Sequence, residues 1–323
     1  MQRIAVFTSG GDAPGMNACI RAVVRTGIAM GKEVYGIRRG YAGMIEEDLF
    51  RMEKSSVSNI IQLGGTILQS ARSEEFKTPE GRKKAYEVLQ KHGIEGVVAI
   101  GGDGTFRGAR IFMDEYPDIA LIGVPGTIDN DLYGTDFTIG YDTAINTAMN
   151  AIDNIKDTAN AHNRLFFIEV MGRDAGFIAL RSAIATGAEA VLIPEDKTEM
   201  EELINMLEDN FHKKKRASIV VVAEGDDAGG AFQIAAQVKE KCPQFDIRCT
   251  VLGHIQRGGR PTCMERVLAS RLGMEAVKAL LVGTKSVMVG EIHRQIVFTP
   301  FEQATKYHQR INPDLIEMVE LLA

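Results

Sequence analysis

Residues 96–105 have the sequence GVVAIGGDGT, in which an apolar run leads directly into two glycines and an aspartate. Residues 3–12, RIAVFTSGGD, have the same construction near the amino terminus. An uninterrupted apolar run of this length indicates a strand that is buried on both faces, as in parallel sheets. The glycines that follow predict a tight turn. We therefore expect an α/β fold whose ligands lie beyond the carboxyl ends of the strands.

Short apolar runs alternate with longer helical patterns along most of the 323 residues. The expected strands are residues 3–8, 33–37, 96–100, 119–124, 165–170, 188–193, 218–223 and 290–297. The expected helices include residues 17–30, 80–92, 143–157, 199–213 and 266–281. This alternation is typical of parallel sheets covered by helices on both faces, so the predicted fold class is α/β.

The composition, with 45% apolar and 25% charged residues, is ordinary for a soluble globular protein. A net charge of -6 argues against a nucleic-acid partner, because binding a phosphate backbone requires a basic face. A local arginine cluster would still allow anionic small molecules to bind. The amino terminus lacks the pattern of a signal peptide, and no apolar run approaches membrane-spanning length. We therefore expect a cytoplasmic protein with no membrane partner.

The cysteines, Cys19, Cys242, Cys249 and Cys263, are scattered and show no paired CxxC spacing. In a chain of this size, that spacing is typical of reduced thiols in the cytoplasm. We expect packing residues rather than disulfides or zinc ligands.

Two glycine-rich loops are candidates for binding phosphate. Residues 10–15, GGDAPG, precede the first expected helix, and residues 100–105 are IGGDGT. Glycine allows close approach of the backbone to an anion, and a helix start offers free N–H groups. The carboxylate of Asp103 suits Mg²⁺, which takes one or two protein oxygens and completes its shell with phosphate and water. Each loop alone is equally typical of a strand–helix turn, but together they favour a nucleoside triphosphate site.

Residues 125–131, PGTIDND, follow the expected strand 119–124 and contain Asp129 and Asp131. Two carboxylates at this spacing allow one to accept a hydroxyl proton while the other binds metal or orients its neighbour. The Asp-Asn-Asp sequence also forms loops readily. The catalytic interpretation is favoured over a simple turn only because the glycine loops occur in the same chain. Basic residues then recur near expected strand ends, where they suit a sugar phosphate, although each alone is more often a surface group: Arg164, Arg173, Arg248, His254 and Arg257.

Five motifs, in the same order, resemble those of the bacterial ATP-dependent 6-phosphofructokinases: residues 9–17, 101–105, 125–131, 169–173 and 253–259. The resemblance covers nearly the whole chain. It implies transfer of the γ-phosphoryl group of MgATP to the 1-hydroxyl of fructose 6-phosphate. Under this resemblance Asp129 is the general base, Asp103 binds Mg²⁺ with Asp131 assisting through water, and Thr127 and Arg173 stabilise the transferring phosphoryl group.

The resemblance also assigns binding residues. Those implied to bind ATP are Gly11, Arg72, Ser73, Gly102, Asp103, Gly104 and Thr105. Those implied to bind fructose 6-phosphate are Thr127, Asp129, Arg164, Met171, Gly172, Arg173, Glu224, Arg248, His254 and Arg257. Arg164 and Arg248 would reach in from a neighbouring subunit, because the family normally assembles as a homotetramer with dihedral symmetry.

The family fold consists of two Rossmann-like three-layer α/β/α domains with mainly parallel sheets. The larger, ATP-binding domain would comprise residues 1–140 and 253–303. The smaller domain, which binds fructose 6-phosphate, would comprise residues 141–252 and 304–323. Closure of the two domains would bring the substrates together.

The family also places an ADP or phosphoenolpyruvate effector at a subunit interface. The matching residues are Arg21, Arg25, Lys54, Lys156, Glu189, Lys213 and Lys215, with Glu189 as the ligand of the effector's Mg²⁺. Lys54 and Lys156 replace arginines of the best-known members, and Lys214 stands where glycine is usual. A competing interpretation is that residues 213–216, KKKR, form a solvated helix end favoured by the helix dipole.

Pyrophosphate-using relatives carry aspartate at the position of Gly104 and lysine at that of Gly126, where side chains would fill the space of the ATP α-phosphate. The two glycines therefore favour ATP. A pyrophosphate-dependent or other sugar-phosphate kinase remains the second enzyme hypothesis. A catalytically silent nucleotide sensor would require loss of the base or metal ligand. A dehydrogenase is disfavoured because residues 102–108 contain one residue too many for G-x-G-x-x-G, and the P-loop and protein-kinase motifs do not occur.

Overall fold

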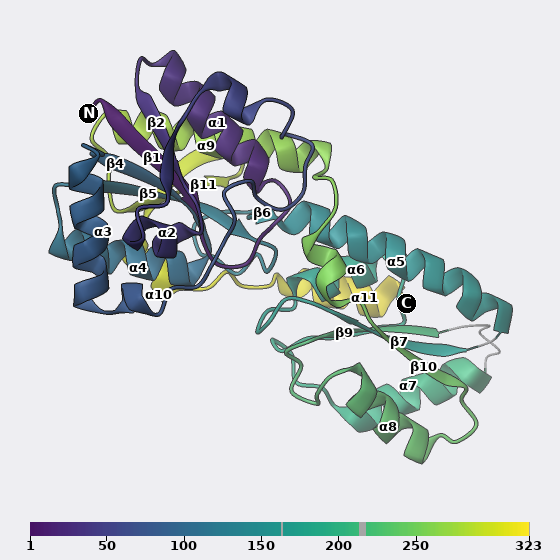
Figure 1. Ribbon diagram of the computed structural model, residues 1–323. Coiled ribbons are helices and arrows are strands. Elements are labelled where there is room, and N and C mark those ends of the chain that lie inside the picture. Colours follow the sequence, from purple (N-terminus) through teal and green to yellow (C-terminus); the bar gives the residue numbers. More distant parts are fainter. Residues whose placement is uncertain (163, 213–217, 323) are drawn as a thin grey trace. The chain divides into compact units, whose positions relative to one another are not determined.

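The computed structural model describes residues 1–162, 164–212 and 218–322 (Figure 1). The chain divides into two compact units. Unit 1 consists of Met1–Ile128, Leu132–Thr143 and Arg257–Gln309. Unit 2 consists of Asp129–Asp131, Ala144–Gln256 and Arg310–Ala323. Both units are built from sheets covered by helices, so the predicted α/β class is confirmed.

The sheet of unit 1 has the strand order β12-β11-β5-β4-β1-β2-β3, with β6 paired to β5. Neighbouring strands from β11 to β2 run parallel, whereas β3 and β12 form antiparallel edges. The strand bounds are β1 Arg3–Thr8, β2 Glu33–Ile37, β3 Leu49–Met52, β4 Gly96–Gly101, β5 Ala120–Thr127, β6 Ile139–Gly140, β11 Val287–Ile292 and β12 Gln295–Pro300. The central strands β1 and β4 are apolar on both faces because helices cover both sides.

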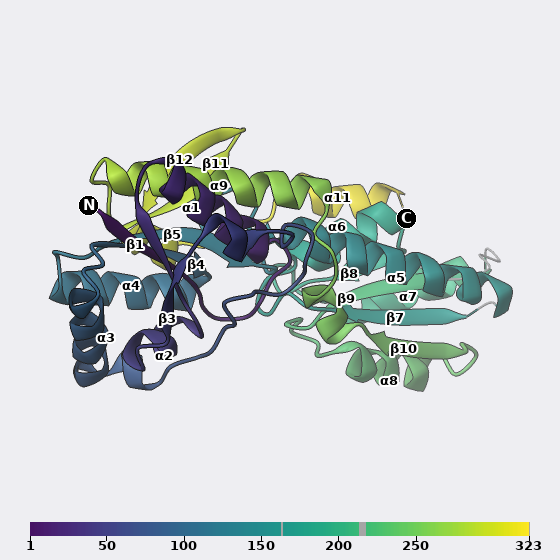
Figure 2. The ribbon, with the colours of Figure 1, turned by 45° about the horizontal axis from the view of Figure 1, so that its top comes forward.

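Helices α1 (Met16–Ala29) and α9 (Cys263–Leu281) pack together along one face of this sheet (Figure 2). Helices α2 (Gly40–Ile45), α3 (Pro79–Lys91), α4 (Asp103–Glu115) and α10 (Phe301–Lys306) cover the other face. Their buried side chains join those of the strands in one aromatic-rich cluster that includes Phe7, Tyr41, Phe106 and Phe301. Short 3₁₀ turns lie at η1 Lys54–Val57 and η2 Glu75–Lys77.

The sheet of unit 2 has the order β10-β7-β9-β8, and its strands are parallel. Their bounds are β7 Leu165–Val170, β8 Ala190–Leu192, β9 Ser218–Ala223 and β10 Ile247–Val251. Helices α7 (Met200–His212) and α8 (Ala231–Lys241) pack on one face. The other face is covered by α6 (Phe177–Thr186), α11 (Pro313–Leu322) and most of α5 (Tyr141–His162). A 3₁₀ turn, η3 (Gly253–Arg257), follows β10.

Most predicted strands form within two residues of their expected bounds, but the strand expected over residues 290–297 is wrong. This segment is a hairpin in which β11 and β12 pair across a turn at His293 and Arg294. Both turn residues have positive φ angles, 48° and 65°. Such turns are usually marked by Asn-Gly or Asp-Gly, and neither pair is present here.

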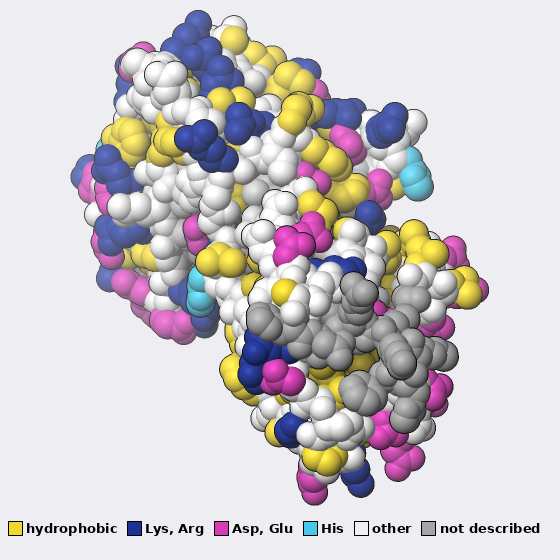
Figure 3. Space-filling model, turned by 90° about the vertical axis from the view of Figure 1, so that its right-hand side faces the viewer, with side chains coloured by type: hydrophobic (Ala, Val, Ile, Leu, Met, Phe, Trp, Pro, Cys, Tyr) yellow, Lys and Arg dark blue, Asp and Glu magenta, His cyan; other side chains and the backbone are white. Residues whose placement is uncertain are grey.

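The prediction that all four cysteines pack in the core is wrong for Cys263, which is exposed at the first residue of α9. Cys19 and Cys242 are buried, and Cys249 is half-buried. On the face shown in Figure 3, acidic and basic side chains are interspersed with apolar ones. Among the helices that the structure describes, none has both the length and the apolar character needed to cross a bilayer.

Candidate active site

The strand order of unit 1 indicates where a ligand would bind. The chain leaves β1 toward β2 on one side and later returns to β4 on the other side. Ligands of open α/β sheets bind beyond the carboxyl ends of the strands at such a reversal. The two predicted phosphate loops follow β1 and β4, and the backbone N–H of Ser9 donates to the carbonyl of Ile100 at 3.0 Å. The structure therefore brings the two loops together.

The first loop lies against Arg257, a residue of the same unit that the sequence analysis expects to bind the sugar phosphate. Gly10 has a φ of 87°, which favours glycine. A Cβ atom on Gly11 would lie 2.5 Å from Nη1 of Arg257, so the guanidinium occupies the space that a side chain would need. Arg257 also donates from Nη1 to the carbonyl of Asp12 at 3.3 Å. A side chain at residue 11 would therefore displace the Arg257 guanidinium.

The second loop places Asp103 at the first residue of α4, after the N-cap Gly102. The Asp103 side chain is 29% exposed and forms an ion pair with Arg107 one turn later. No group of three or more metal-ligating side chains occurs within the described ranges. A single accessible carboxylate beside backbone N–H groups nevertheless fits Mg²⁺ carried by a nucleotide, because phosphates and water supply most of its ligands.

Gly104 and Gly126, which the sequence analysis predicts to favour ATP, have different surroundings. A Cβ on Gly104 would meet nothing within 4 Å, so a side chain there would enter open space beside Asp103. A Cβ on Gly126 would lie 3.0 Å from Cε of Met16 and 3.1 Å from Cγ2 of Ile100. The first atom of a side chain at residue 126 would therefore meet packed residues of α1 and β4.

The segment that follows residue 68 lies beside the first loop. Thr8 donates from Oγ1 to the carbonyl of Gln69 at 2.7 Å, and the Ser70 hydroxyl donates to the carbonyl of Gly10. The Ser73 hydroxyl accepts from the N–H of Phe76 at 3.2 Å, and Arg72 is exposed. The predicted ATP residues Arg72 and Ser73 thus follow directly on a segment that is held against the first loop.

Tyr41 was missed by the sequence analysis. Its ring stacks on Phe76 with centroids 3.8 Å apart, and its hydroxyl donates to the carbonyl of Thr105 at 2.7 Å. Burial raises the pKa of Tyr41, which keeps this hydroxyl protonated. Tyr41 therefore fixes the first turn of α4, although a tyrosine in a glycine-rich helix has no sequence motif that would reveal this contact.

Thr127 ends β5 next to the second loop, where its Cβ lies 3.8 Å from the position of a Cβ on Gly102. Pairing with β6 aligns Thr127 with Gly140, and the carbonyl of Thr127 accepts from Oγ1 of Thr138 at 2.6 Å. The structure therefore brings together the predicted residues Gly11, Gly102, Asp103, Gly104, Thr105, Thr127 and Arg257 at one edge of the unit 1 sheet.

Glu265, which the sequence analysis also missed, anchors β6 from α9. Its fully buried carboxylate accepts from the N–H of Gly140 at 2.7 Å, and from the N–H and hydroxyl of Thr143 at 3.1 and 3.2 Å. Burial raises the pKa of Glu265 from its ordinary value of 4.5 to about 7, despite the opposing backbone hydrogen bonds. Glu265 thus connects the start of α5 to the strand that aligns Thr127.

This pKa predicts how stability depends on pH. Between pH 4.5 and about 7 the folded state holds a proton on Glu265 that the unfolded state has lost, so stability falls as pH rises through that window. The contribution is on the order of 1 kcal/mol per pKa unit. We expect Glu265→Gln to lose this part of the pH dependence. Urea unfolding at pH 5 and pH 8 measures it, and an identical pH dependence in both proteins would contradict the prediction.

In unit 2, the residues that follow β7 and β9 form a second cluster of predicted site residues. Glu224 follows β9 and accepts, through one carboxylate oxygen, from the N–H groups of Gly172 at 3.3 Å and Arg173 at 2.7 Å. Arg173 has a φ of 53°, an unfavourable conformation for a side chain other than glycine. A Cβ on Gly225 would lie 2.0 Å from the Arg173 carbonyl oxygen, so the backbone of Gly225 packs closely against this turn.

This turn directs the Arg173 side chain toward Asp129. Nε of Arg173 lies 3.6 Å from Oδ2 of Asp129, whose side chain is only 3% exposed. The N–H of Met171 donates to Oε1 of the buried Gln256 at 3.3 Å, which links the end of β7 to η3. His254, also in η3, is exposed. The structure therefore places Asp129, Met171, Gly172, Arg173 and Glu224 in one cluster, with His254 on the adjoining η3.

Arg164 and Arg248 lie at the other end of this sheet. Arg164 precedes β7, and Arg248 is the second residue of β10. Both pair with Asp246, at 2.8 and 2.7 Å, and the hydrogen bond from Arg164 is the main reason that the pKa of Asp246 is lowered. A strand of six residues spans about 20 Å. Within one chain, these two arginines therefore do not join the cluster at the carboxyl ends.

The predicted effector residues fall into separate groups. Arg21 and Arg25 lie one turn apart on α1, and η1, which begins at Lys54, packs against the same helix. In unit 2, Lys156 donates to the carbonyls of Thr186 at 2.6 Å and Gly187 at 3.1 Å, at the end of α6. Glu189 accepts from Nδ2 of Asn210 at 3.3 Å. Lys213 and Lys215 lie outside the described residues.

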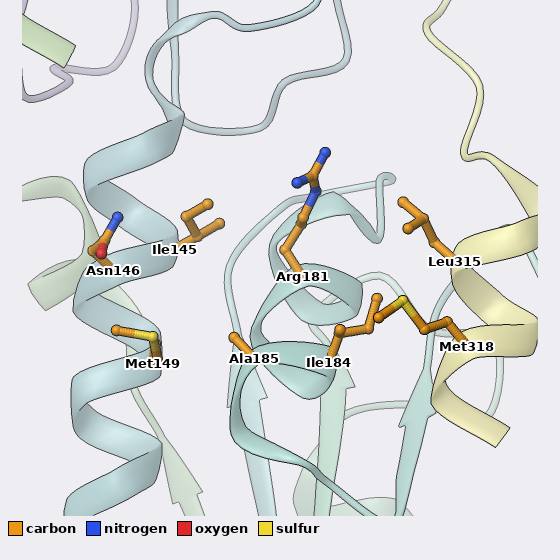
Figure 4. Close-up of a pocket in the computed structure, with 8 residues that line it drawn as sticks. All are labelled: Ile145, Asn146, Met149, Arg181, Ile184, Ala185, Leu315 and Met318. Atoms are coloured by element: carbon orange, nitrogen blue, oxygen red, sulfur yellow. The ribbon is translucent and has the colours of Figure 1, made fainter. Parts of the chain in front are cut away.

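Unit 2 also has an apolar groove of about 350 Å³ between α5, α6 and α11 (Figure 4). Its lining residues are Ile145, Asn146, Met149, Arg181, Ile184, Ala185, Leu315 and Met318. A phosphate site requires several converging donors, whereas aliphatic and methionine side chains dominate this surface. The groove therefore does not fit a sugar phosphate, which the polar cluster after β7 and β9 suits better.

Comparison with known proteins identifies relatives over the full chain. A family model described as Phosphofructokinase matches residues 3–280. The ATP-dependent 6-phosphofructokinase of Cytophaga hutchinsonii is 57% identical over 322 residues, covering 100% of this chain and 98% of the relative. ATP-dependent 6-phosphofructokinase 1 of Thermus thermophilus is 57% identical over 323 residues, with 100% coverage of both chains.

Solved structures agree in fold. The structure of phosphofructokinase from Saccharomyces cerevisiae matches with a TM-score of 0.89 and 36% identity, covering 95% of this chain. This chain spans only 45% of that yeast chain. A pyrophosphate-dependent phosphofructokinase from Marinobacter aquaeolei matches with a TM-score of 0.86 at 22% identity, which shows similarity of fold alone.

Proposed function

The chain belongs to the phosphofructokinase family, and from this premise we propose that it is an ATP-dependent 6-phosphofructokinase. It would transfer the γ-phosphoryl group of MgATP to the 1-hydroxyl of fructose 6-phosphate, the committed step of glycolysis in the cytoplasm. The observation that carries the proposal is 57% identity over the whole length to ATP-dependent 6-phosphofructokinases from two bacteria. The loop geometry of unit 1 and the polar cluster of unit 2 supply the chemical reasons.

ATP would bind at the carboxyl ends of β1 and β4. The backbone of Gly11, Gly102, Gly104 and Thr105 lies at two loops that are hydrogen-bonded to each other through Ser9 and Ile100. The start of α4 offers N–H groups and a favourable dipole to the phosphates. Arg72 and Ser73 would complete the nucleotide contacts from the segment beside Gly10.

Mg²⁺ would be held by Asp103 together with the nucleotide phosphates. When bound, it would neutralise charge on the phosphates and on the group being transferred. The open space at Gly104 supports ATP as the donor, because a Cβ there would meet no atom within 4 Å outside its own turn of α4. The packed surroundings of Gly126 support the same choice indirectly, because a lysine there would first have to displace Met16.

Asp129 would accept the proton of the attacking 1-hydroxyl. Its buried carboxylate lies beside the Arg173 guanidinium, with Nε of Arg173 3.6 Å from Oδ2. Thr127 precedes Asp129 by two residues, a span of at most about 7 Å. Thr127 and Arg173 would stabilise charge on the phosphoryl group, which requires fixed donors rather than covalent help.

Fructose 6-phosphate would be bound by Met171, Gly172, Glu224, His254 and Arg257. Arg164 and Arg248 would complete the site from a neighbouring subunit of a homotetramer. Their position at the opposite end of the unit 2 sheet supports this part of the proposal, because they are too far away to serve their own chain. Each carries a charge that is partly engaged by Asp246 until a partner subunit is present.

ADP and phosphoenolpyruvate would act at a separate effector site. Arg21, Arg25 and Lys54 would contribute from unit 1, and Lys156, Glu189, Lys213 and Lys215 from unit 2. Lys156 currently holds the end of α6, so an anionic effector would compete with the carbonyls of Thr186 and Gly187 for its ammonium group. A change in fructose 6-phosphate affinity would then follow through linkage.

The proposal is tested by a coupled assay for fructose 1,6-bisphosphate with ATP and pyrophosphate supplied separately. We expect turnover with ATP and Mg²⁺ and none above background with pyrophosphate. ADP and phosphoenolpyruvate are then titrated at subsaturating fructose 6-phosphate, where an effect of either supports regulation. Turnover with pyrophosphate alone would overturn the donor assignment.

The turn at Arg173 leads to a specific prediction for Glu224. Glu224→Ala removes the acceptor for the N–H groups of Gly172 and Arg173, so the left-handed turn should relax and the Arg173 side chain should move. We expect kcat to fall about 10- to 100-fold, with a higher KM for fructose 6-phosphate. Steady-state kinetics measures both. Glu224→Gln keeps an acceptor oxygen and should lose less, and equal losses in both variants would contradict this role.

A further inference from the structure

Arg107 is an exposed arginine on α4 that no part of the proposed mechanism uses. Its Nε lies 3.1 Å from Oδ1 and 3.0 Å from Oδ2 of Asp103, one helical turn earlier. Its Nη2 donates to the carbonyl of Thr305 at 3.5 Å, near the end of α10. All three residues belong to unit 1, and α10 packs against α4. The guanidinium is therefore held between the predicted metal ligand and the C-terminal end of a neighbouring helix.

An exposed ion pair within a helix usually contributes little to stability, and the Arg107 side chain is 57% exposed. The effect of this pair on ligand binding has a separate cause, which is the charge of Asp103. Asp103 carries a negative charge at the place where a polyanionic nucleotide would bind, and Arg107 neutralises that charge while no cation is present. A metal ion that binds this carboxylate must compete with the Arg107 guanidinium, because both cations are drawn to the same two oxygens.

We propose that Arg107 is a positioning residue of the nucleotide site, which pairs with Asp103 in the metal-free protein and gives way to the metal of the metal–nucleotide complex. The inference rests on the proposed function. The carbonyl of Thr305 gives the guanidinium a second partner, so Arg107 can release Asp103 without leaving the surface of α4. Arg107 then determines how strongly the site distinguishes MgATP from metal-free ATP.

Two consequences follow for Arg107→Met, which keeps an unbranched apolar stem on the helix and removes the charge. Metal-free ATP should bind more weakly, because its phosphates would face an unneutralised Asp103. MgATP should bind as tightly as in wild type or more tightly, because the metal no longer displaces a guanidinium. The ratio of the two affinities should therefore rise about two- to fivefold, as expected for an exposed pair.

The experiment is isothermal titration calorimetry of the full chain with ATP in EDTA and with ATP in excess Mg²⁺. Arg107→Lys keeps a positive charge at the same helical spacing and should keep the ratio within about twofold of wild type. Arg110→Met removes the same charge from the same helix, about 10 Å along the helix axis from Asp103, and should leave the ratio unchanged. These controls separate the Asp103 pair from the general effect of charge on α4.

A second pair of titrations tests whether Arg107 acts through Asp103. In an Asp103→Asn background, Arg107→Met should no longer change the affinity ratio. A ratio that still changes there would overturn the inference, as would an unchanged ratio in the single variant or a shift of the same size in Arg110→Met. If the wild-type chain bound neither form of ATP, the proposed function itself would fail. A protein that binds ATP but shows an unchanged ratio overturns only the role of Arg107.

Discussion

Asp129→Asn is expected to lower turnover by about 10²- to 10⁴-fold, the usual contribution of a positioned general base. Asparagine has nearly the same shape as aspartate but does not accept a proton from an attacking hydroxyl. The Asp129 carboxylate is buried, and Nε of Arg173 lies 3.6 Å from it, so the substitution removes a charge from a defined pair. Affinity for MgATP should remain near that of wild type, because the proposed nucleotide contacts lie on unit 1.

Steady-state kinetics and calorimetric titration with MgATP check the two parts of this prediction separately. Asp131→Asn is the matched control, because it makes the same chemical change two residues later in the same segment. It should lower turnover less than Asp129→Asn does. Near-normal turnover of Asp129→Asn would remove this residue from the role of base, and a larger loss in Asp131→Asn would transfer the role to Asp131.

Glu115→Ala is expected to reduce the free energy of unfolding by about 3 kcal/mol. Arg82 on α3 is 6% exposed and donates from Nε and Nη2 to the two carboxylate oxygens of Glu115, both at 2.6 Å. Removing Glu115 leaves a buried guanidinium without its anion. The loss should lie at the lower end of the range for broken buried pairs, because the carbonyls of Phe76 and Lys77 still accept from Nη1 of Arg82.

Urea unfolding followed by circular dichroism measures this loss, and a double variant supplies the control. Arg82→Met/Glu115→Ala removes both charges and should be more stable than Glu115→Ala alone, because no buried charge remains unpaired. A double variant that is less stable than Glu115→Ala would show that packing of the arginine stem, rather than its charge, dominates at this position.

The fold was predictable to the extent that its signals are local. Runs such as residues 4–7 and 165–168 are apolar at every position, and such a pattern fits a strand between two layers of helices. The hairpin of β11 and β12 was not predictable in the same way. Its turn uses His293 and Arg294, which adopt positive φ angles although neither is a usual turn residue of this type. Pairing of the hairpin with β5 at the edge of the sheet outweighs this local cost.

The candidate site was predictable where a motif carries its own chemistry. Gly11, Asp103, Asp129 and Arg173 stand in glycine-rich or acidic segments at strand ends. The supporting residues Tyr41 and Glu265 were not predictable, because each acts through contacts with residues distant in the chain. Glu265 can anchor β6 only because the fold buries its carboxyl group against the N–H groups of Gly140 and Thr143.

The sequence by itself determined that this chain is an α/β protein with phosphate-binding glycine turns and a pair of aspartates after a strand, because these features depend on neighbours in the chain. Only the tertiary structure decided which side chains meet. It placed Arg257 against Gly11 and the Glu224 carboxylate on the backbone N–H groups at Arg173, and it placed Arg164 and Arg248 at the opposite end of the unit 2 sheet from that turn. The physical reason is that strand order and strand direction, which no local pattern encodes, determine which end of the sheet each residue reaches.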